Sequence, residues 1–432
     1  MRVLHTSDWH LGRTFHGAAL LEEQAAALDR IVELAREGEV DAVLIAGDIY
    51  DRAIPPAEAV RLFNDTLARL RAAGAAVVAI AGNHDSHVRV SVYDPLLSAL
   101  GVTIRGDVRR ANQPVIVTPR RGGGPVAIYP LPFLDPAVDG PSLEAEGLEP
   151  EGIAEESLER ESLERESLEP ESVSVERGAV SPGGRLRHEE VTRLALARLR
   201  RDLRQRPGHR SILVAHGFVA GGVPCESERE LTVGNVERVS VEAFAGFDLV
   251  ALGHLHRAQE LDGPRLAYSG SPLPYSFSEE GQRKEVRLVD LAADGPPTVE
   301  RVPLAVGRPL ATVEGEIERL LRDPALEAAA EARVRVVLTD EMLPLQAKAR
   351  LQRRFPHIAE LRHRPPRADH QPSSDRQQRV RRATSPLELL TAFYTDQQGR
   401  PATAREEQLL RRALEAAGGQ HGDRGREPGS AP

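Results

Sequence analysis

Five short apolar runs, each followed at once by acidic, amide or histidine side chains, mark the chain up to residue 256. The runs are Val3-Leu4 and residues 42–46, 77–81, 212–214 and 249–252. Continuous apolar runs of this kind predict strands that are buried on both faces. The polar clusters therefore lie where strands end and loops begin, and open α/β sheets build their sites at such ends.

Helical patterns alternate with these runs. Residues 22–37, 56–73 and 189–205 are rich in Ala, Leu, Arg and Glu, and Pro55-Pro56 suits the start of a helix. Residues 249–291 are dominated by strand and turn signals. Alternating strands and helices followed by a strand-rich half predict an α/β fold with two sheets packed face to face and helices outside, over residues 1–297.

The pattern changes near residue 298. Strand, helix, strand, helix and strand are predicted in turn, at residues 299–302, 313–321, 333–338, 343–354 and 357–361. We therefore expect a small α+β domain at residues 298–361. Residues 362–384 are rich in Arg, Pro, Ser and Gln and predict a flexible basic linker, with a contact to the DNA backbone as the alternative.

Two more helical patterns lie at residues 385–418. Ser385-Pro386 suits the start of the first, and Thr403 to Glu406 has the spacing of a capping box ahead of the second. Their apolar stripes are Leu387, Leu390 and Tyr394, and then Leu410 and Leu414. Two short helices after a linker cannot bury both stripes against each other, so we expect a partner-binding segment. Packing back onto the first domain is the alternative, and residues 419–432 predict a disordered tail.

The acidity of the chain is local. The net charge is -9, but residues 141–180 contain thirteen glutamates and three arginines, so the rest of the chain carries about +1. Glu-Ser-Leu-Glu repeats every five residues from Glu156, a period that fits neither a helix nor a strand. We therefore predict a solvated, disordered insertion at about residues 139–184. An acidic DNA mimic or a partner-docking helix is the alternative.

The remaining composition limits the compartment and the phosphate chemistry. Cys225 is the one cysteine, so no intramolecular disulfide can form. No basic segment followed by a long apolar stretch opens the chain, and no apolar run approaches the roughly 18 residues of a membrane span. We therefore expect a cytoplasmic protein without a membrane segment. Lys284 and Lys348 are the only lysines, so any phosphate contacts must rely on arginine.

The polar clusters at the strand ends have metal-binding chemistry. They are Asp8-Trp9-His10, Gly47-Asp48, Gly82-Asn83-His84-Asp85, Ala215-His216-Gly217 and Gly253-His254-Leu255-His256. Carboxylate, amide oxygen and imidazole without thiolate suit a divalent ion such as Mn²⁺. A lone histidine at a strand end is more often a structural hydrogen-bonding residue. Five clusters with the same polarity favour a metal site.

The order D-x-H, G-D-x-x-D, G-N-H-D, H-G and G-H-x-H resembles the calcineurin-like metallophosphoesterases. Within them, Leu11-Gly12-Arg13 and Ser269-Gly270-Ser271-Pro272 are similar to the SbcD family of nuclease subunits. The resemblance covers residues 1 to about 274 apart from the insertion, and it returns near the C-terminus. It implies a four-layer αββα sandwich with a small α+β cap domain and a C-terminal helical pair.

The resemblance also implies roles for single residues. It implies two divalent metal ions, which we expect to be Mn²⁺, and seven ligands. These are Asp8, His10 and His256 for the first ion, Asn83, His216 and His254 for the second, and Asp48 between them. His84 is implied as a catalytic residue that Asp51 orients in a dyad, although Asp51 could instead cap a turn. Arg13, His16 and Arg52 are expected to be ordinary surface residues.

The function implied is a metal-dependent DNA nuclease, a 3′-5′ double-strand exonuclease and single-strand or hairpin endonuclease. Its implied partners are DNA, an SbcC-like coiled-coil ATPase and a second copy, as a homodimer within a heterotetramer. No Walker-type phosphate loop is present in the sequence, so ATP dependence must come from the partner. The alternative is a stand-alone phosphoesterase acting on phosphoproteins or small phosphodiesters. A small-molecule enzyme needs neither the cap nor the helical pair.

Overall fold

The computed structural model describes residues 1–146, 186–228, 238–366, 385–398 and 400–419. These fall into two compact units, Met1–Val337 with Leu345–Arg362, and Leu338–Pro344 with His363–Pro432. The acidic insertion beyond residue 146, the basic linker beyond residue 366 and the tail beyond residue 419 lie outside the described residues.

A first six-stranded sheet contains the strands nearest the N-terminus. Its order is β14 (Thr298–Pro303), β13 (Glu285–Asp290), β1 (Arg2–Thr6), β4 (Ala42–Ala46), β5 (Ala76–Ile80) and β6 (Val102–Arg105). Strands β1, β4, β5 and β6 run parallel, and β13 and β14 are antiparallel additions at one side. The carboxyl ends of β1, β4 and β5 therefore share one edge.

The second sheet also has six strands. Its order is β11 (Gln259–Asp262), β12 (Leu266–Tyr268), β10 (Leu249–Gly253), β9 (Arg210–His216), β8 (Val126–Pro130) and β7 (Val115–Val117). Strands β12, β10, β9 and β8 are parallel, with antiparallel strands at both edges. All five strands predicted from the apolar runs are confirmed.

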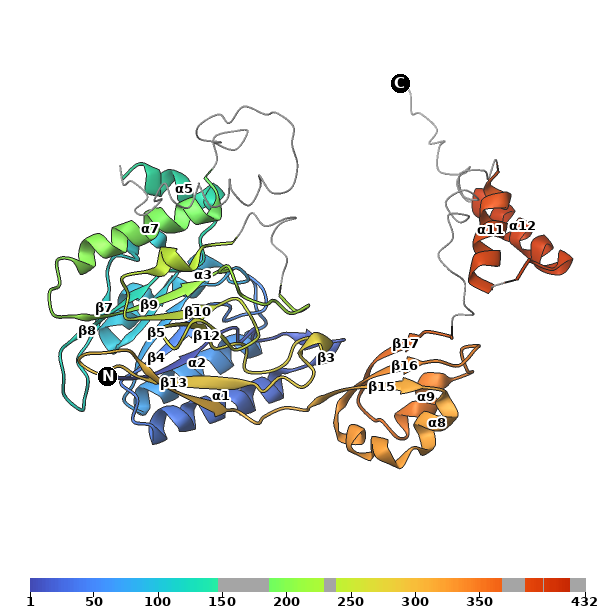
Figure 1. Ribbon diagram of the computed structural model, residues 1–432, viewed down its shortest axis with the longest axis horizontal. Helices are drawn as coiled ribbons and strands as arrows, with labels where there is room; N and C mark the ends of the chain where they lie inside the picture. Colours follow the sequence, from blue (N-terminus) through green and yellow to red (C-terminus); the bar gives the residue numbers. More distant parts are fainter. Residues whose placement is uncertain (147–185, 229–237, 367–384, 399, 420–432) are drawn as a thin grey trace, which may run out of the picture. The chain divides into compact units, whose positions relative to one another are not determined.

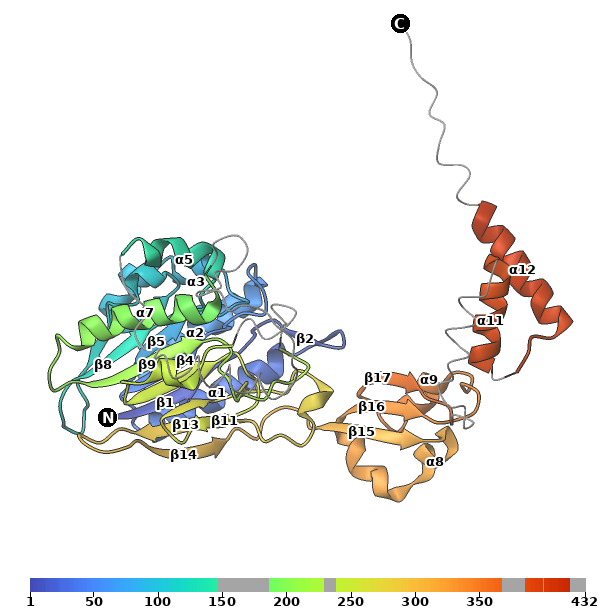
Figure 2. The ribbon, with the colours of Figure 1, turned by 45° about the horizontal axis from the view of Figure 1, so that its top comes forward.

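Side-chain alternation along the strands builds four layers. On β4, Ala42, Leu44 and Ala46 enter the apolar core between the two sheets, while Val43 and Ile45 face outward. The outward side chains pack on α1 (Leu21–Glu37) and α2 (Ala57–Ala72). Helices α5 (Pro136–Glu144) and α7 (His188–Leu203) cover the other sheet in the same way (Figures 1 and 2). The predicted αββα sandwich is confirmed.

Shorter elements connect these layers. A small hairpin joins β2 (Thr14–Phe15) to β3 (Ala18–Ala19). After β5 the chain forms α3 (His87–Ser91), α4 (Asp94–Leu97) and the 3₁₀ turn η1 (Ser98–Leu100). The remaining 3₁₀ turns of the sandwich are η2 (Val108–Arg110), η4 (Val241–Phe244) and η5 (Phe277–Glu279).

A three-stranded sheet with order β15-β16-β17 follows the sandwich. Its elements are β15 (Leu310–Gly315), α8 (Ile317–Arg322), the 3₁₀ stretch η6 (Pro324–Glu331), β16 (Arg333–Leu338), α9 (Ala347–Gln352) and β17 (Ile358–His363). Arg333 forms an ion pair with Glu23 of α1 at 2.5 Å, and Arg335 lies over the ring of Phe277. The α+β cap is therefore attached to the sandwich by buried arginine contacts.

Two details of the cap differ from the sequence expectation. The strand expected to open the cap is β14, which pairs with β13 in the first sheet and gives that strand a hydrogen-bonding partner on its outer side. The helix expected at residues 313–321 is instead the end of β15 followed by α8. Burial alternates along β15 with the period of a strand, and this extended segment runs to Gly315.

The two C-terminal helices are α11 (Pro386–Gln398) and α12 (Ala404–Gly419), and they pack against each other. The Tyr394 hydroxyl donates to Glu406 at 2.6 Å. The side chains expected to form the partner stripes, Leu387, Leu390, Tyr394, Leu410 and Leu414, are half-buried in this pair. Among the side chains described in this pair, the exposed large apolar ones are Leu389, Phe393 and Leu409. No helix in the described part of the chain has both the length and the apolarity to cross a bilayer.

Candidate metal centre

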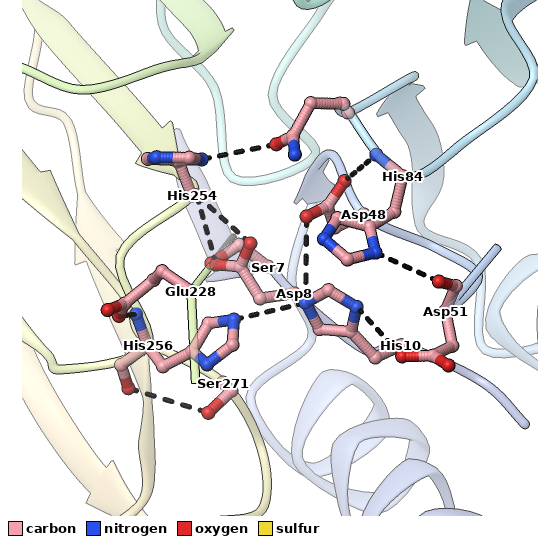
Figure 3. Close-up of polar contacts among 12 residues, drawn as sticks. Ser7, Asp8, His10, Asp48, Asp51, His84, Glu228, His254, His256 and Ser271 are labelled. Atoms are coloured by element: carbon pink, nitrogen blue, oxygen red, sulfur yellow. Dashed lines mark hydrogen bonds and ion pairs between the residues drawn. The ribbon is translucent and has the colours of Figure 1, made fainter. Parts of the chain in front are cut away.

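All candidate metal ligands converge at one edge of the sandwich. Those of the first sheet follow β1, β4 and β5, and those of the second lie at the end of β9 and directly after β10. Figure 3 shows Asp8, His10, Asp48, His254 and His256 gathered there. The candidate ligand atoms form three overlapping groups, and the atoms of each group lie within 4.8 Å of one another. The groups are Asp8, His10 and His256; Asp8, Asp48 and His216; and His10, Asp48 and His84.

The backbone is strained at these positions. Asp8, His10 and Asp48 have φ values of 54°, 43° and 47°, and His254 has a φ of 113°. Side chains other than glycine rarely adopt positive φ, and such residues persist only where the surroundings enforce them, often at functional sites. The loop after β1 is held by buried Gln24, whose amide donates to the carbonyls of Trp9 and His10 at 3.1 and 2.7 Å.

Asp85 fixes the neighbouring loops. Its carboxylate accepts from the main-chain N–H groups of Ile49, Tyr50 and Gly82 at 2.9 to 3.0 Å, and so joins the loops after β4 and β5. Burial, with the charge of Asp48 adding to it, raises the pKa of Asp85 to about 7. The sequence showed Asp85 within a motif but gave it no role. Its contacts are those of a structural carboxylate.

Asp48 lies between two sets of candidate ligands. Its Oδ2 is 3.5 Å from Nε2 of His10 and 3.6 Å from Nε2 of His216. Its Oδ1 accepts from the His84 main-chain N–H at 2.9 Å. The carboxylate of Asp48 is thus within 3.6 Å of histidines from both sets.

The first candidate set contains two histidines whose ring nitrogens face each other. Nε2 of His10 lies 3.0 Å from Nε2 of His256, and Nδ1 of His10 is buried without a hydrogen-bond partner. The carboxylate of Asp8 accepts from the Ser7 hydroxyl at 2.6 Å and from the His254 main-chain N–H at 3.0 Å.

The second set gives the clearest test of a metal. Nδ1 of His216 donates to the Ala46 carbonyl at 2.8 Å, so Nε2 must carry a lone pair. That lone pair faces Oδ1 of Asn83 at 2.9 Å, and Nδ1 of His254 lies 3.1 Å from the same oxygen. Nε2 of His216 and Oδ1 of Asn83 are both acceptors and have no proton to share, and the amide nitrogen of Asn83 is buried without a hydrogen-bond partner. A divalent cation fits both the lone pairs and the donor types.

The pKa shifts of these side chains also favour a bound cation. Burial and the neighbouring Asp48 raise the pKa of Asp8, and burial raises the pKa of Asp48 to about 6. Burial lowers the pKa of His216 to about 3 and lowers the pKa values of the other candidate histidines, His10, His254 and His256. The imidazoles are therefore neutral with lone pairs available, while the carboxylates lie where a cation would stabilise their charge.

His84 and Asp51 meet differently from the dyad expected. Nδ1 of His84 donates to the main-chain carbonyl of Asp51 at 2.8 Å, and not to its carboxylate. That carboxylate lies 3.6 Å from the Arg13 guanidinium and 3.8 Å from Nδ1 of His10. The loop after β4 places the Asp51 carbonyl against the His84 imidazole and leaves the Asp51 side chain beside Arg13. Asp51 thus orients His84 through an atom that every residue type has.

Arg13 is not the ordinary surface residue that was expected. It donates to the Ser227 carbonyl at 2.9 Å, and its guanidinium lies 4.8 Å from the centre of the Tyr275 ring. Arg52 is exposed, as expected, and the exposed ring of His16 rests against Phe15 and Phe277.

Comparison with known proteins agrees with this geometry. Residues 1–258 match the calcineurin-like phosphoesterase family, and residues 306–398 match a family described as the type 5 capsule protein repressor C-terminal domain. The SbcD subunit of the nuclease SbcCD from Staphylococcus saprophyticus is 31% identical over 75% of this chain and 74% of its own length.

The chain belongs to the SbcD family of calcineurin-like phosphoesterases. The proteins of the same name from Bacillus subtilis and Escherichia coli K12 are 33% and 29% identical, over 72% and 73% of this chain and 71% and 72% of their own lengths. The resemblance predicted from the motifs is confirmed. The SbcD-family chain is a phosphodiesterase whose Asp and His side chains suit divalent metal binding.

Removal of a direct ligand should abolish both metal binding and catalysis. We expect Asp48→Ala and His254→Ala each to lose bound Mn²⁺ and to slow phosphodiester hydrolysis by more than about 100-fold, beyond the range for outer partners of a metal site. The apolar core between the sheets should keep both variants folded. Elemental analysis, hydrolysis rates and thermal unfolding measure the three properties.

His209→Ala is the matched control, because His209 lies just before the start of β9, at the opposite end of that strand from His216. It should behave as the parent protein does. Full activity with normal metal content in Asp48→Ala or His254→Ala would remove the ligand assignment.

Proposed function

We propose that this chain is the nuclease subunit of a complex with an SbcC-type coiled-coil ATPase and that its substrate is DNA. The reactions proposed are 3′-5′ exonuclease cleavage of duplex ends and endonuclease cleavage of single strands and hairpins, in DNA end processing, repair and recombination in the cytoplasm. The observation that carries the proposal is the convergence of two ligand sets on Asp48, in a chain whose relatives are named as parts of a nuclease.

Two divalent cations, proposed to be Mn²⁺, have their ligands among the residues described. Asp8, His10 and His256 would hold the first, Asn83, His216 and His254 the second, and Asp48 both. When bound, such a pair stabilises charge on the phosphoryl group and lowers the pKa of a water molecule. The buried neutral imidazoles and the fixed carboxylates supply the dry, preorganised surroundings that this chemistry needs.

His84 is proposed to act on the substrate. Its main-chain N–H is held by Asp48 and its Nδ1 by the Asp51 carbonyl, so the ring is fixed from two sides. A ring that donates through Nδ1 leaves Nε2 to contact a phosphoryl oxygen or to carry a proton to the leaving oxygen. A stand-alone phosphoesterase would share this machinery. The match of residues 306–398 to a second family favours the SbcD-type function.

His84→Ala should leave the Mn²⁺ content unchanged and reduce turnover by about 10² or more, the scale of a lost general acid. Asp51→Asn keeps the carbonyl that holds His84 and should retain the metals and most of the turnover. Metal analysis beside single-turnover DNA cleavage tests both. Because His84 lies in one of the convergent groups, loss of metal in step with activity would make it a ligand instead.

A homodimer is proposed from an apolar stripe on α3, α4 and η1. Val88, Val92, Leu96 and Leu100 recur every four residues and are 57 to 76% exposed, with Tyr93 exposed beside them. Monomers rarely expose contiguous apolar patches of large side chains unless a partner covers them. A second copy is the proposed partner, because a two-fold interface lets one stripe pack against its own equivalent.

Leu96→Glu should convert the dimer to a monomer, since it places a charge in the middle of the stripe. Sedimentation equilibrium of the full chain measures this. Leu345→Glu, at an exposed leucine outside the stripe, is the control and should stay dimeric. A parent protein that sediments as a monomer at micromolar concentration would contradict the proposal.

The C-terminal pair is proposed to bind the coiled coil of the ATPase. Leu389 and Phe393 are one helical turn apart on α11, and with Leu409 of α12 they leave apolar side chains in water. A helix face of this kind suits docking between helices.

Truncation after Thr384 removes both helices and no candidate ligand. Mn²⁺-dependent cleavage of single-stranded DNA should persist, while co-purification with the ATPase and ATP-stimulated duplex degradation should be lost. Leu389→Asp with Phe393→Asp should have the same effect in the full chain, and Val138→Asp, at an exposed valine of α5, should not. Full-affinity binding of the truncated chain to the ATPase would refute the docking role.

A further inference from the structure

The outer nitrogen of His256 meets a hydroxyl. Nδ1 of His256 lies 2.7 Å from Oγ of Ser227, and the same Oγ donates to Oε1 of Glu279 at 2.7 Å. Glu279 is only 1% exposed. A histidine of the first ligand set is thus connected to a buried carboxylate through one serine.

Glu279 is fixed on every side. Its Oε1 also accepts from the main-chain N–H groups of Tyr275 and Ser276, both at 2.9 Å, and its Oε2 pairs with the Lys284 ammonium. The two main-chain N–H groups and the ammonium are all donors, so the Glu279 carboxylate acts as their acceptor.

Lys284 completes the network. Its ammonium donates to the His256 carbonyl at 2.8 Å and to the Ser271 hydroxyl at 3.0 Å, as well as to Glu279. Three acceptors match the three N–H bonds of an ammonium. The chain has 56 Lys and Arg residues, of which only Lys284 and Lys348 are lysines, so arginine is the rule elsewhere. A planar guanidinium presents a different donor geometry and is not an equivalent here.

The direction of the hydrogen bonds decides the tautomer of His256. Oε1 of Glu279 accepts from two main-chain N–H groups and also from the Ser227 hydroxyl, which has one proton to give. The Ser227 oxygen is then left to accept from Nδ1–H of His256. With the ring proton on Nδ1, Nε2 carries the lone pair, and it is Nε2 that faces His10. His216 reaches the same tautomer more simply, by donating Nδ1–H to the Ala46 carbonyl.

We propose that Ser227, Glu279 and Lys284 are positioning residues that hold His256 in the Nδ1–H tautomer, so that Nε2 can bind the first cation. The proposal rests on the proposed metal roles. Partners behind a ligand histidine commonly fix its tautomer and orientation in this way. None of the three residues belongs to the second ligand set, so the two sets should respond differently when the network is broken.

Mn²⁺ titration of the metal-free full chain, followed by electron paramagnetic resonance, tests the proposal. Ser227→Ala removes the acceptor of Nδ1–H. In Glu279→Gln, the side-chain NH₂ group must face donors in either orientation. It meets the Lys284 ammonium in one and the two main-chain N–H groups with the Ser227 hydroxyl in the other. In both variants, one of the two Mn²⁺ ions should bind about 10- to 100-fold more weakly and the other as in the parent. The ¹⁵N resonances of His256 should show a protonated Nδ1 in the metal-free parent and lose this state in both variants.

Two further variants separate positioning from general damage. Ser227→Thr keeps the hydroxyl and should restore parental Mn²⁺ binding. Ser278→Ala removes a neighbouring hydroxyl that contacts the Glu226 main chain and Ser276, and it should bind both ions as the parent does.

Equal weakening of both ions with a matching fall in melting temperature would show a structural role only and overturn the proposal. Unchanged binding of both ions, or a parent His256 protonated on Nε2, would overturn it as well. If the two variants weaken only one of the two Mn²⁺ ions but the parent cleaves no DNA, the proposed nuclease function is refuted and the positioning role stands.

Discussion

The centre depends on how closely the two sheets approach at their carboxyl ends. A Cβ atom on Gly253 would lie 1.7 Å from the Ala46 carbonyl oxygen, so only glycine allows β10 to come this near to β4. The same carbonyl receives Nδ1–H of His216 from β9. One backbone oxygen of the first sheet thus sets the distance to two strands of the second. The candidate ligands of β4 and those of β9 and β10 lie close enough for the proposed shared ions only at this separation.

This arrangement buries groups that oppose folding in the absence of a cation. Two carboxylates and four neutral imidazoles lose their contact with solvent when the chain folds, and four of these six residues have positive φ. Such costs amount to about 1 to 3 kcal/mol for each strained residue. The apolar layer between the sheets and the contacts of Asp85 and Gln24 must outweigh them. A cation that binds only the folded chain adds to that stability by mass action.

The local parts of this design were predictable from sequence. The strands are short apolar runs, and the five polar clusters lie directly at their ends, so pattern and residue type were enough to place them. The choice of seven ligands within these clusters came from the family resemblance and stays a prediction. The supporting residues were not predictable, because Asp85, Ser227 and Glu279 work through contacts with distant segments. The family resemblance implied that Asp51 and His84 meet, but it could not tell a carboxylate from a main-chain carbonyl. Residues 299–302 were rightly predicted as a strand, but only the fold shows which sheet it joins.

Asp48 and His84 are coupled more tightly than two separate functional residues need be. The carboxylate of Asp48 accepts from the His84 main chain, while its own loop supplies the Asp51 carbonyl to the His84 ring. A shift of the β4 loop would therefore move the Asp48 carboxylate and the His84 imidazole together. Their spacing would be preserved in such a shift, and the proton transfer proposed for His84 requires a fixed spacing. The β4 loop is held in turn by Asp85 and by the Ala46 contact, so the position of the imidazole traces back to the same approach of the two sheets.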